Sequence, residues 1–148
     1  MKITRRDLCI AAVTCCITAA LAVAARSFEK MSSTIISWEE MTVRQTKTGA
    51  VRSVFRAPTA TLDELECHIT TLNPGETSHA PHQHPEEEII IVKEGFVEQF
   101  ANGVTKRVGP GAVIFLASGE MHSIRNVGEA PATYHVFSWH SAATPAKK

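Results

Sequence analysis

After residue 40 the sequence is divided into short runs rich in β-branched and aromatic residues, and this division most constrains the fold. Gly, Pro or Asn separates each run from the next, and no stretch sustains a helical apolar period. The runs cover residues 51–55, 66–72, 89–92, 96–100, 113–116 and 133–139. Many short strands at even spacing predict an all-β sandwich or barrel.

Two of these runs allow more detailed predictions. Residues 96–100 and 104–108 flank Asn102-Gly103, a pair favoured in two-residue hairpin turns. The run at 89–92 is apolar throughout, so we expect that strand to be covered on both faces. Four phenylalanines are expected in the core, with the wall of a substrate pocket as the alternative: Phe96, Phe100, Phe115 and Phe137.

The first 24 residues differ from the rest and predict an export signal. A basic start is followed by an uncharged stretch at 8–25 and by the small-residue cleavage pattern Ala22-Val23-Ala24. The residues at 4–8, T-R-R-D-L, resemble a twin-arginine signal. We expect cleavage and a periplasmic or secreted chain. An uncleaved membrane anchor, a lipoprotein and a cytosolic start at Met31 are the alternatives.

Charge and cysteine content exclude several classes of protein. The chain has 15 basic and 15 acidic residues, so no charge excess indicates binding to nucleic acid. Removal of 1–24 leaves Cys67 as the only cysteine, which excludes an intramolecular disulfide. Because it lies in a predicted strand, we expect Cys67 to be a small buried side chain rather than a reactive thiol.

The histidines form a metal-ligand pattern. In His82-Gln83-His84 the two imidazoles share one face if the segment is a strand. Glu88 follows His84 by four residues, and His122 comes from a later strand after Gly119. Three imidazoles and one carboxylate suit a divalent transition metal such as Fe, Mn, Ni or Zn. Open positions beside these ligands would allow a substrate to bind the metal.

The spacing around these residues resembles the two conserved motifs of the cupin superfamily. The matching positions are His82, His84, Glu88 and Gly95 in the first motif and Gly111, Gly119, His122 and Asn126 in the second. The chain departs from the pattern because Gly75 lies one residue farther from His82 than usual. Ala117 and Ala112 also stand where a proline and an acidic residue are common.

The resemblance implies a small antiparallel β-barrel, also called a double-stranded β-helix or jelly roll, with one metal ion inside it. The implied ligands are His82, His84, Glu88 and His122. It also implies a homodimer. The predicted organisation is a signal peptide at 1–24, an N-terminal segment at 25–58 that could serve as a dimer arm, a barrel at 59–141 and a tail at 142–148. Within the second segment, residues 38–41 suggest one helical turn.

The remaining histidines have weaker signals. His79, in the extended loop before the first motif, is the candidate for a pocket-rim acid/base or an extra ligand, with a plain loop residue as the alternative. His135 alternates with Phe137 and is expected to pack at a dimer interface. His68 and His140 are expected to be ordinary strand or surface residues. Beyond His79 or an unliganded Glu the sequence offers no clear general base, which favours chemistry at the metal over proton shuttling.

These observations lead to two functional hypotheses. The first is an exported, metal-dependent enzyme of dioxygenase, decarboxylase or isomerase type that acts on a small organic molecule. The second is a non-catalytic protein that binds a small ligand or the metal itself. Both predict no nucleic-acid partner and no stable membrane span after processing.

Overall fold

The computed structural model describes residues 29–146, so the predicted export signal at 1–24 lies outside the described residues. Within that range the only helical element is the 3-10 turn η1 (Trp38–Glu40), where the sequence predicted one helical turn. The turn begins at Ser37, whose backbone N–H donates to Glu40 Oε2 at 2.7 Å. No helix in the described part of the chain is long and apolar enough to cross a membrane.

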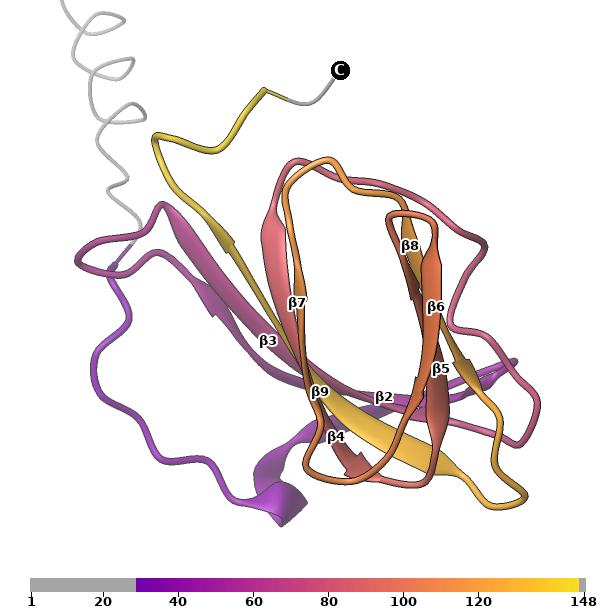
Figure 1. Ribbon diagram of the computed structural model, residues 1–148. Helices are drawn as coiled ribbons and strands as arrows, with labels where there is room; N and C mark the ends of the chain where they lie inside the picture. The colour runs from indigo at the N-terminus through magenta and orange to yellow at the C-terminus, as the bar shows by residue number, and fades with distance from the viewer. Residues whose placement is uncertain (1–28, 147–148) are drawn as a thin grey trace, which may run out of the picture.

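Between residues 29 and 146, nine antiparallel strands form two sheets that face each other (Figure 1). They are β1 (Thr42–Thr46), β2 (Gly49–Ala57), β3 (Glu64–Leu72), β4 (Glu87–Glu94), β5 (Val97–Ala101), β6 (Val104–Val108), β7 (Val113–Leu116), β8 (His122–Asn126) and β9 (Ala132–His140). The larger sheet has the order β1-β2-β3-β9-β4-β7, and the smaller has the order β6-β5-β8. The predicted all-β antiparallel barrel is therefore confirmed. Strands β1 and β2 lie in the predicted N-terminal segment and form one edge of the larger sheet.

The hairpin between β5 and β6 has the predicted two-residue turn. Asn102 and Gly103 have φ values of +46° and +83°, and Ala101 pairs with Val104 across the turn. Positive φ at both central positions matches the right-handed twist of the flanking strands. Asn tolerates this conformation better than most residues, and Gly adopts it without steric cost.

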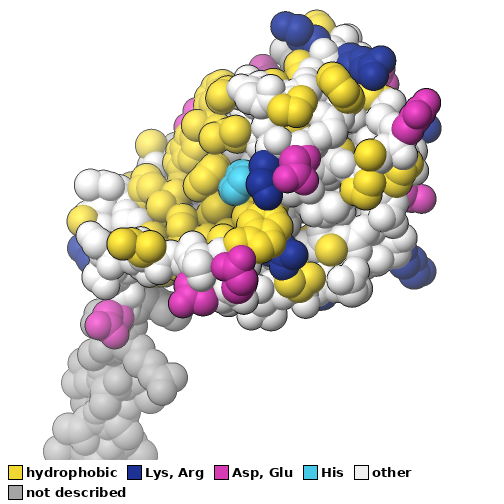
Figure 2. Space-filling view, turned by 90° about the horizontal axis from the view of Figure 1, so that it is seen from below, with side chains coloured by type: hydrophobic (Ala, Val, Ile, Leu, Met, Phe, Trp, Pro, Cys, Tyr) yellow, Lys and Arg dark blue, Asp and Glu magenta, His cyan; other side chains and the backbone are white. Residues whose placement is uncertain are grey.

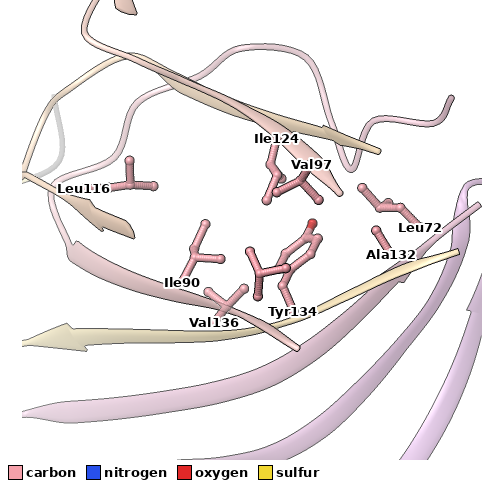
Figure 3. Close-up of a cluster of buried hydrophobic side chains, with 9 residues drawn as sticks. Leu72, Ile90, Val97, Leu116, Ile124, Ala132, Tyr134 and Val136 are labelled. Carbon is pink, nitrogen blue, oxygen red and sulfur yellow. The ribbon is translucent and has the colours of Figure 1, made fainter. Parts of the chain in front are cut away.

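The hydrophobic core lies between the two sheets (Figure 3). Both sheets contribute to it: its buried members are Leu72, Ile90, Val92, Val97, Leu116, Ile124, Ala132, Tyr134 and Val136. Burying each of the larger aliphatic side chains contributes roughly 1.5–3 kcal/mol. This core joins the two sheets.

Two predictions about the core were wrong. The 89–92 strand is not covered on both faces, because Ile90 and Val92 are buried whereas Ile91 is 36% exposed. Phe96 and Phe115 are 47% and 56% exposed and so lie outside the core. The physical reason is that Ile91 and Phe115 point to the outer face of the larger sheet, which is exposed at β4 and β7. Phe96 lies between β4 and β5, outside both sheets.

Asn126 fixes the loop after β8, as predicted. Its side chain is fully buried, and its Nδ2 donates to the carbonyls of Leu72 and Ala130 at 2.9 Å each. Its Oδ1 accepts the backbone N–H of Gly128 at 2.9 Å. These bonds connect the end of β8 to β3 and to the loop before β9, and thereby hold the strand that begins at His122.

Candidate metal centre

Two backbone contacts bring the motif histidines to one place. His82 forms an isolated antiparallel bridge with His122, with N–H to carbonyl distances of 3.1 and 2.9 Å. The His84 carbonyl accepts the backbone N–H of Gly119 at 2.9 Å. The strand that the sequence argument assumed for His82-Gln83-His84 is not present, because residues 83–86 are not in a strand. The bridge to β8 orients the segment instead.

The three histidines form a compact cluster. One ring nitrogen from each of His82, His84 and His122 lies within 4.8 Å of the others. The ring centroids of His82 and His122 are 4.5 Å apart, and those of His84 and His122 are 4.8 Å apart. Among residues 29–146 this is the one group of three or more His, Cys, Asp or Glu residues close enough to hold a metal ion.

Glu88 is the fourth predicted ligand and lies against this cluster. It is near the start of β4, and its Oε2 is 3.1 Å from His84 Nε2. The Glu88 side chain is 14% exposed and the His84 side chain 20%. The structure therefore brings all four predicted ligands together, and their role as ligands stays a prediction.

Hydrogen bonds at the far side of two rings determine which nitrogen faces the cluster. His84 Nδ1 donates to the Glu86 carbonyl at 3.0 Å, and His122 Nδ1 donates to the Glu120 carbonyl at 2.8 Å. Each Nε2 is then left with its lone pair free, which is the arrangement of metal-binding histidines in proteins.

Two features of the cluster fit a bound cation. Because Nδ1 of His84 donates its proton, Nε2 of a neutral His84 carries a lone pair. Glu88 Oε2, which also carries lone pairs, lies 3.1 Å from this nitrogen, so a proton or a metal ion must lie between the two atoms. Two ligands about 2.1 Å from a metal and at right angles would be about 3.0 Å apart. In addition, His82 Nδ1 is buried without a hydrogen-bond partner. A nitrogen in that position is costly unless it binds something.

The cluster also keeps His82 neutral. Burial is the main cause that lowers the pKa of His82 to about 4, and the neighbouring His79, His122 and His84 lower it further. A neutral imidazole is the form that binds a metal. His82 therefore remains a competent ligand well below neutral pH.

A cavity of about 490 Å³ opens onto the cluster. His122 and Glu88 lie in its wall, together with polar side chains from β1, β2, β3, β5 and β9. Volumes of about 300–1,000 Å³ are typical of small-molecule sites. A second opening of about 340 Å³ reaches His84 and Glu88 from the side of Trp139.

His79 lies at the wall of the larger cavity, a position that agrees with a pocket-rim residue and with a plain loop residue alike. It is exposed, and its ring centroid is 4.0 Å from that of His82. Its Nδ1 lies 3.3 Å from the Ala80 carbonyl. A role for His79 in acid/base chemistry stays a prediction.

The structure contradicts the expectation that His68 is an ordinary strand or surface residue. His68 lies on the inner face of β3 and lines both openings, as does Glu66. His68 Nδ1 is 2.9 and 3.1 Å from the two carboxylate oxygens of Glu66. The alternation E-x-H in the 66–72 run could have indicated a shared face, although not that this face is the interior.

The sequence analysis also missed polar residues of the cavity that carry no motif. Gln99 on β5 is 5% exposed, and its Oε1 has no hydrogen-bond partner. Burial raises the pKa of Tyr134 to about 12, so that this hydroxyl remains protonated. Arg44 on the edge strand β1 is exposed at the cavity wall. These side chains provide an acceptor, a donor and a positive charge around the cluster.

Comparison with known proteins agrees with this geometry. Residues 68–138 match the family model of the cupin domain. The protein contains a cupin domain. The match begins at His68 and includes all four predicted ligands, and it confirms the resemblance seen in the two sequence motifs. A search of curated proteins finds no match.

Solved structures with the same fold have varied activities in their names. A predicted oxalate decarboxylase from Thermotoga maritima has a TM-score of 0.60 and 22% identity, covering 72% of this chain and 99% of its own. A sugar phosphate isomerase of the cupin superfamily from Silicibacter pomeroyi has a TM-score of 0.59 and 18% identity, covering 73% and 76%. The polyketide cyclase RemF from Streptomyces resistomycificus has a TM-score of 0.58 and 18% identity, covering 79% and 84%. At these identities the likeness establishes the fold alone.

Proposed function

We propose that this cupin-domain protein is a metal-dependent enzyme that acts on a small organic molecule by decarboxylase, isomerase or dioxygenase chemistry. The observation that supports it most is that the three-histidine cluster, with Glu88 against it, opens through His122 and Glu88 onto a cavity of about 490 Å³. A structural metal site is normally closed by protein ligands, whereas a catalytic one opens to substrate. The solved structures named as a decarboxylase, an isomerase and a cyclase agree with such a use of the fold.

In this proposal the metal is held by His82, His84, Glu88 and His122. The metal, one of Fe, Mn, Ni or Zn, would act as a Lewis acid that polarises a substrate oxygen. The chain's own residues bind and orient the substrate. Gln99 Oε1 can accept a hydrogen bond from a substrate hydroxyl, and the Tyr134 hydroxyl can donate one.

Substrate turnover by the metal-loaded protein tests this function. The purified protein is reconstituted separately with Fe(II), Mn(II), Ni(II) and Zn(II), and is then incubated with a panel of small hydroxy and keto acids and sugar phosphates. We expect turnover of at least one class with one metal, and its loss in His84→Ala. His140→Ala is the matched control, because His140 lies on β9 with 44% side-chain exposure and outside the cluster. Full metal loading without any turnover would instead favour the non-catalytic binding protein.

We further propose that the protein forms a homodimer through the outer face of the larger sheet. A groove of about 230 Å³ on this face is lined by apolar side chains, including Phe55, Ile69 and Phe137. The register continues this face through Ile89 to Phe115. Figure 2 shows hydrophobic side chains gathered on the face seen from below, around a histidine. A contiguous exposed apolar patch is typical of a protein–protein interface.

Light scattering after size exclusion tests the dimer. Phe115→Asp places a charge on the outer face, where Phe115 is 56% exposed, and should convert the dimer to a monomer. Val104→Asp is the control, because Val104 is 66% exposed but lies on β6 of the smaller sheet. A monomeric wild type, or the same molar mass for the Phe115→Asp and Val104→Asp variants, would contradict this interface.

We also propose that the chain is exported and that its signal is removed. The support is the sequence of residues 1–24 alone. Intact-mass analysis of the protein from the periplasm should give a chain that begins near residue 25. Recovery of the full-length chain from the cytoplasm alone would contradict export.

A further inference from the structure

A second pair of titratable side chains lies in the same cavity as the candidate metal centre and outside its ligand set. Glu66 and His68 are at alternate positions of β3, on the face that also bears Thr70 and Leu72. The intervening Cys67 and the following Ile69 face the outer groove. The strand therefore directs Glu66 and His68 into the barrel, and Cys67 and Ile69 outward.

The two side chains form a carboxylate–imidazole pair. Both oxygens of Glu66 are within 3.1 Å of His68 Nδ1, and Ser138 Oγ donates to Glu66 Oε2 at 3.4 Å. The Glu66 side chain is 15% exposed and the His68 side chain 30%. A carboxylate at Nδ1 keeps the proton on that nitrogen and leaves Nε2 as the unprotonated atom, and it stabilises the imidazolium formed when Nε2 accepts a proton.

The pair is placed beside the candidate metal ligands. In the larger sheet Glu66 pairs with Ser138, and Ser138 pairs with Glu88 on the next strand. Two strand spacings of about 4.8 Å separate the backbones of the two glutamates. Glu66, His68 and Glu88 line both the larger cavity and the second opening. A small molecule bound at the histidine cluster can therefore also contact His68.

The cavity also indicates which chemical groups such a molecule carries. Gln99 is 95% buried, and its Oε1 has no hydrogen-bond partner among the described residues. A buried polar atom without a partner is costly, so a ligand that supplies a hydroxyl group would satisfy it. The proposed metal would polarise a substrate carbonyl. A ligand with both a hydroxyl and a carbonyl group is a small α-hydroxy carbonyl compound.

We propose that His68, oriented by Glu66, is the proton-transfer residue for an α-hydroxy carbonyl substrate bound in this cavity, an inference that rests on the proposed function. His68 Nε2 removes the proton from the carbon that bears the hydroxyl. The electron pair of that C–H bond forms the C=C bond of an enediolate, and the carbonyl π pair moves to its oxygen. The imidazolium then returns this proton to carbon. Return to the same carbon regenerates the substrate. Return to the former carbonyl carbon isomerises it: the hydroxyl-bearing carbon becomes the carbonyl, and its hydroxyl proton passes to the former carbonyl oxygen, so there is no net redox change. This selects isomerase-type chemistry over oxygenation.

Solvent deuterium exchange measures this proton removal directly. Dihydroxyacetone and hydroxypyruvate, one neutral and one anionic, are incubated in D₂O with the metal-reconstituted full-length protein, and the loss of their C–H signals is followed by ¹H NMR. General-base residues contribute roughly 10²–10⁴-fold to rate. We therefore expect His68→Gln to slow exchange by about 100-fold or more, and His140→Gln to leave it unchanged. Glu66→Gln should lower the rate to a smaller extent.

A second readout does not depend on turnover. In metal-free protein, ¹⁵N NMR of the His68 ring should show the tautomer protonated at Nδ1. In Glu66→Gln the ring should shift toward the tautomer protonated at Nε2. An Nε2-protonated ring in the wild type would overturn the proposal even if no metal binds.

The outcomes separate this inference from the proposed function. If His84→Ala stops exchange but His68→Gln does not, the metal-dependent enzyme stands and the role of His68 is refuted. If the loaded wild type turns over another substrate but exchanges neither probe, the α-hydroxy carbonyl assignment is refuted. If no metal binds, the proposed function fails, and the tautomer measurement still decides whether Glu66 orients His68.

Discussion

Replacing Asn126 by alanine tests how the barrel holds the strand that begins with His122. The side chain is fully buried and makes three hydrogen bonds, to Leu72, Ala130 and Gly128. Each such bond contributes about 1 kcal/mol net, and a buried partner left unsatisfied costs about 1–3 kcal/mol. We expect Asn126→Ala to lower the free energy of unfolding by about 3 kcal/mol, since water can reach part of the loop once the side chain is gone.

Urea denaturation followed by circular dichroism measures this loss, and a thermal scan should show a fall in Tm of roughly 10 °C. Asn73→Ala is the matched control, because Asn73 is exposed and the structure gives its side chain no hydrogen bond. Exposed substitutions of this kind change stability by about 0.5 kcal/mol or less. A loss below about 1 kcal/mol for Asn126→Ala, or equal losses in the two variants, would refute the reasoning.

Three further predictions concern single residues. Gly95→Ala should destabilise the fold far more than Gly111→Ala, although both glycines have positive φ. A Cβ at Gly95 would lie 2.7 Å from Ala132 Cα, whereas a Cβ at Gly111 would have no neighbouring atom within 4 Å. Comparing the urea midpoints of the two variants checks the clash. Cys67 should react with Ellman's reagent at pH 8 only after unfolding, because burial raises its thiol pKa to about 12; rapid reaction of the native protein would contradict this. The free energy of unfolding of the metal-free protein should be highest above about pH 6.5 and should fall as the pH decreases toward 4. Over that range His82 becomes protonated in the unfolded chain but stays neutral in the folded chain, where its pKa is about 4. His82→Gln should show a weaker fall in urea midpoint between pH 7 and 5.

The sequence predicted the fold class and the ligand cluster because both depend on local pattern. Turn residues at Asn102-Gly103 predicted the hairpin. Motif spacing predicted four ligands, and the structure brings His82, His84 and His122 together with Glu88 beside His84, while their role as ligands stays a prediction. The long-range bridge between His82 and His122 was not predictable from either segment alone.

The remaining parts of the site depend on which face of each strand turns inward. On β3, Glu66 and His68 alternate with Cys67 and Ile69, and an ordinary amphipathic strand would place the apolar pair inside. Here the apolar pair faces the outer groove, and the polar pair lines the cavity. Phe115 is exposed for a different reason: β7 is apolar on both faces, with Leu116 in the core and Phe115 on the outer face. Sequence periodicity does not distinguish a core face from an exposed apolar face.

The metal content of the purified protein is the most direct test of the proposed metal centre. The full-length protein is purified without chelator, equilibrated separately with Fe(II), Mn(II), Ni(II) and Zn(II), and freed of excess metal by gel filtration. Its bound metal is then measured by elemental mass spectrometry. The same measurement is made on the variants His84→Ala and His122→Ala and on the control His140→Ala. The account predicts about one metal ion per chain in the wild type and in His140→Ala, and a large loss in the two cluster variants. No bound metal in a folded wild type, or full occupancy in the double variant His84→Ala/His122→Ala, would contradict it.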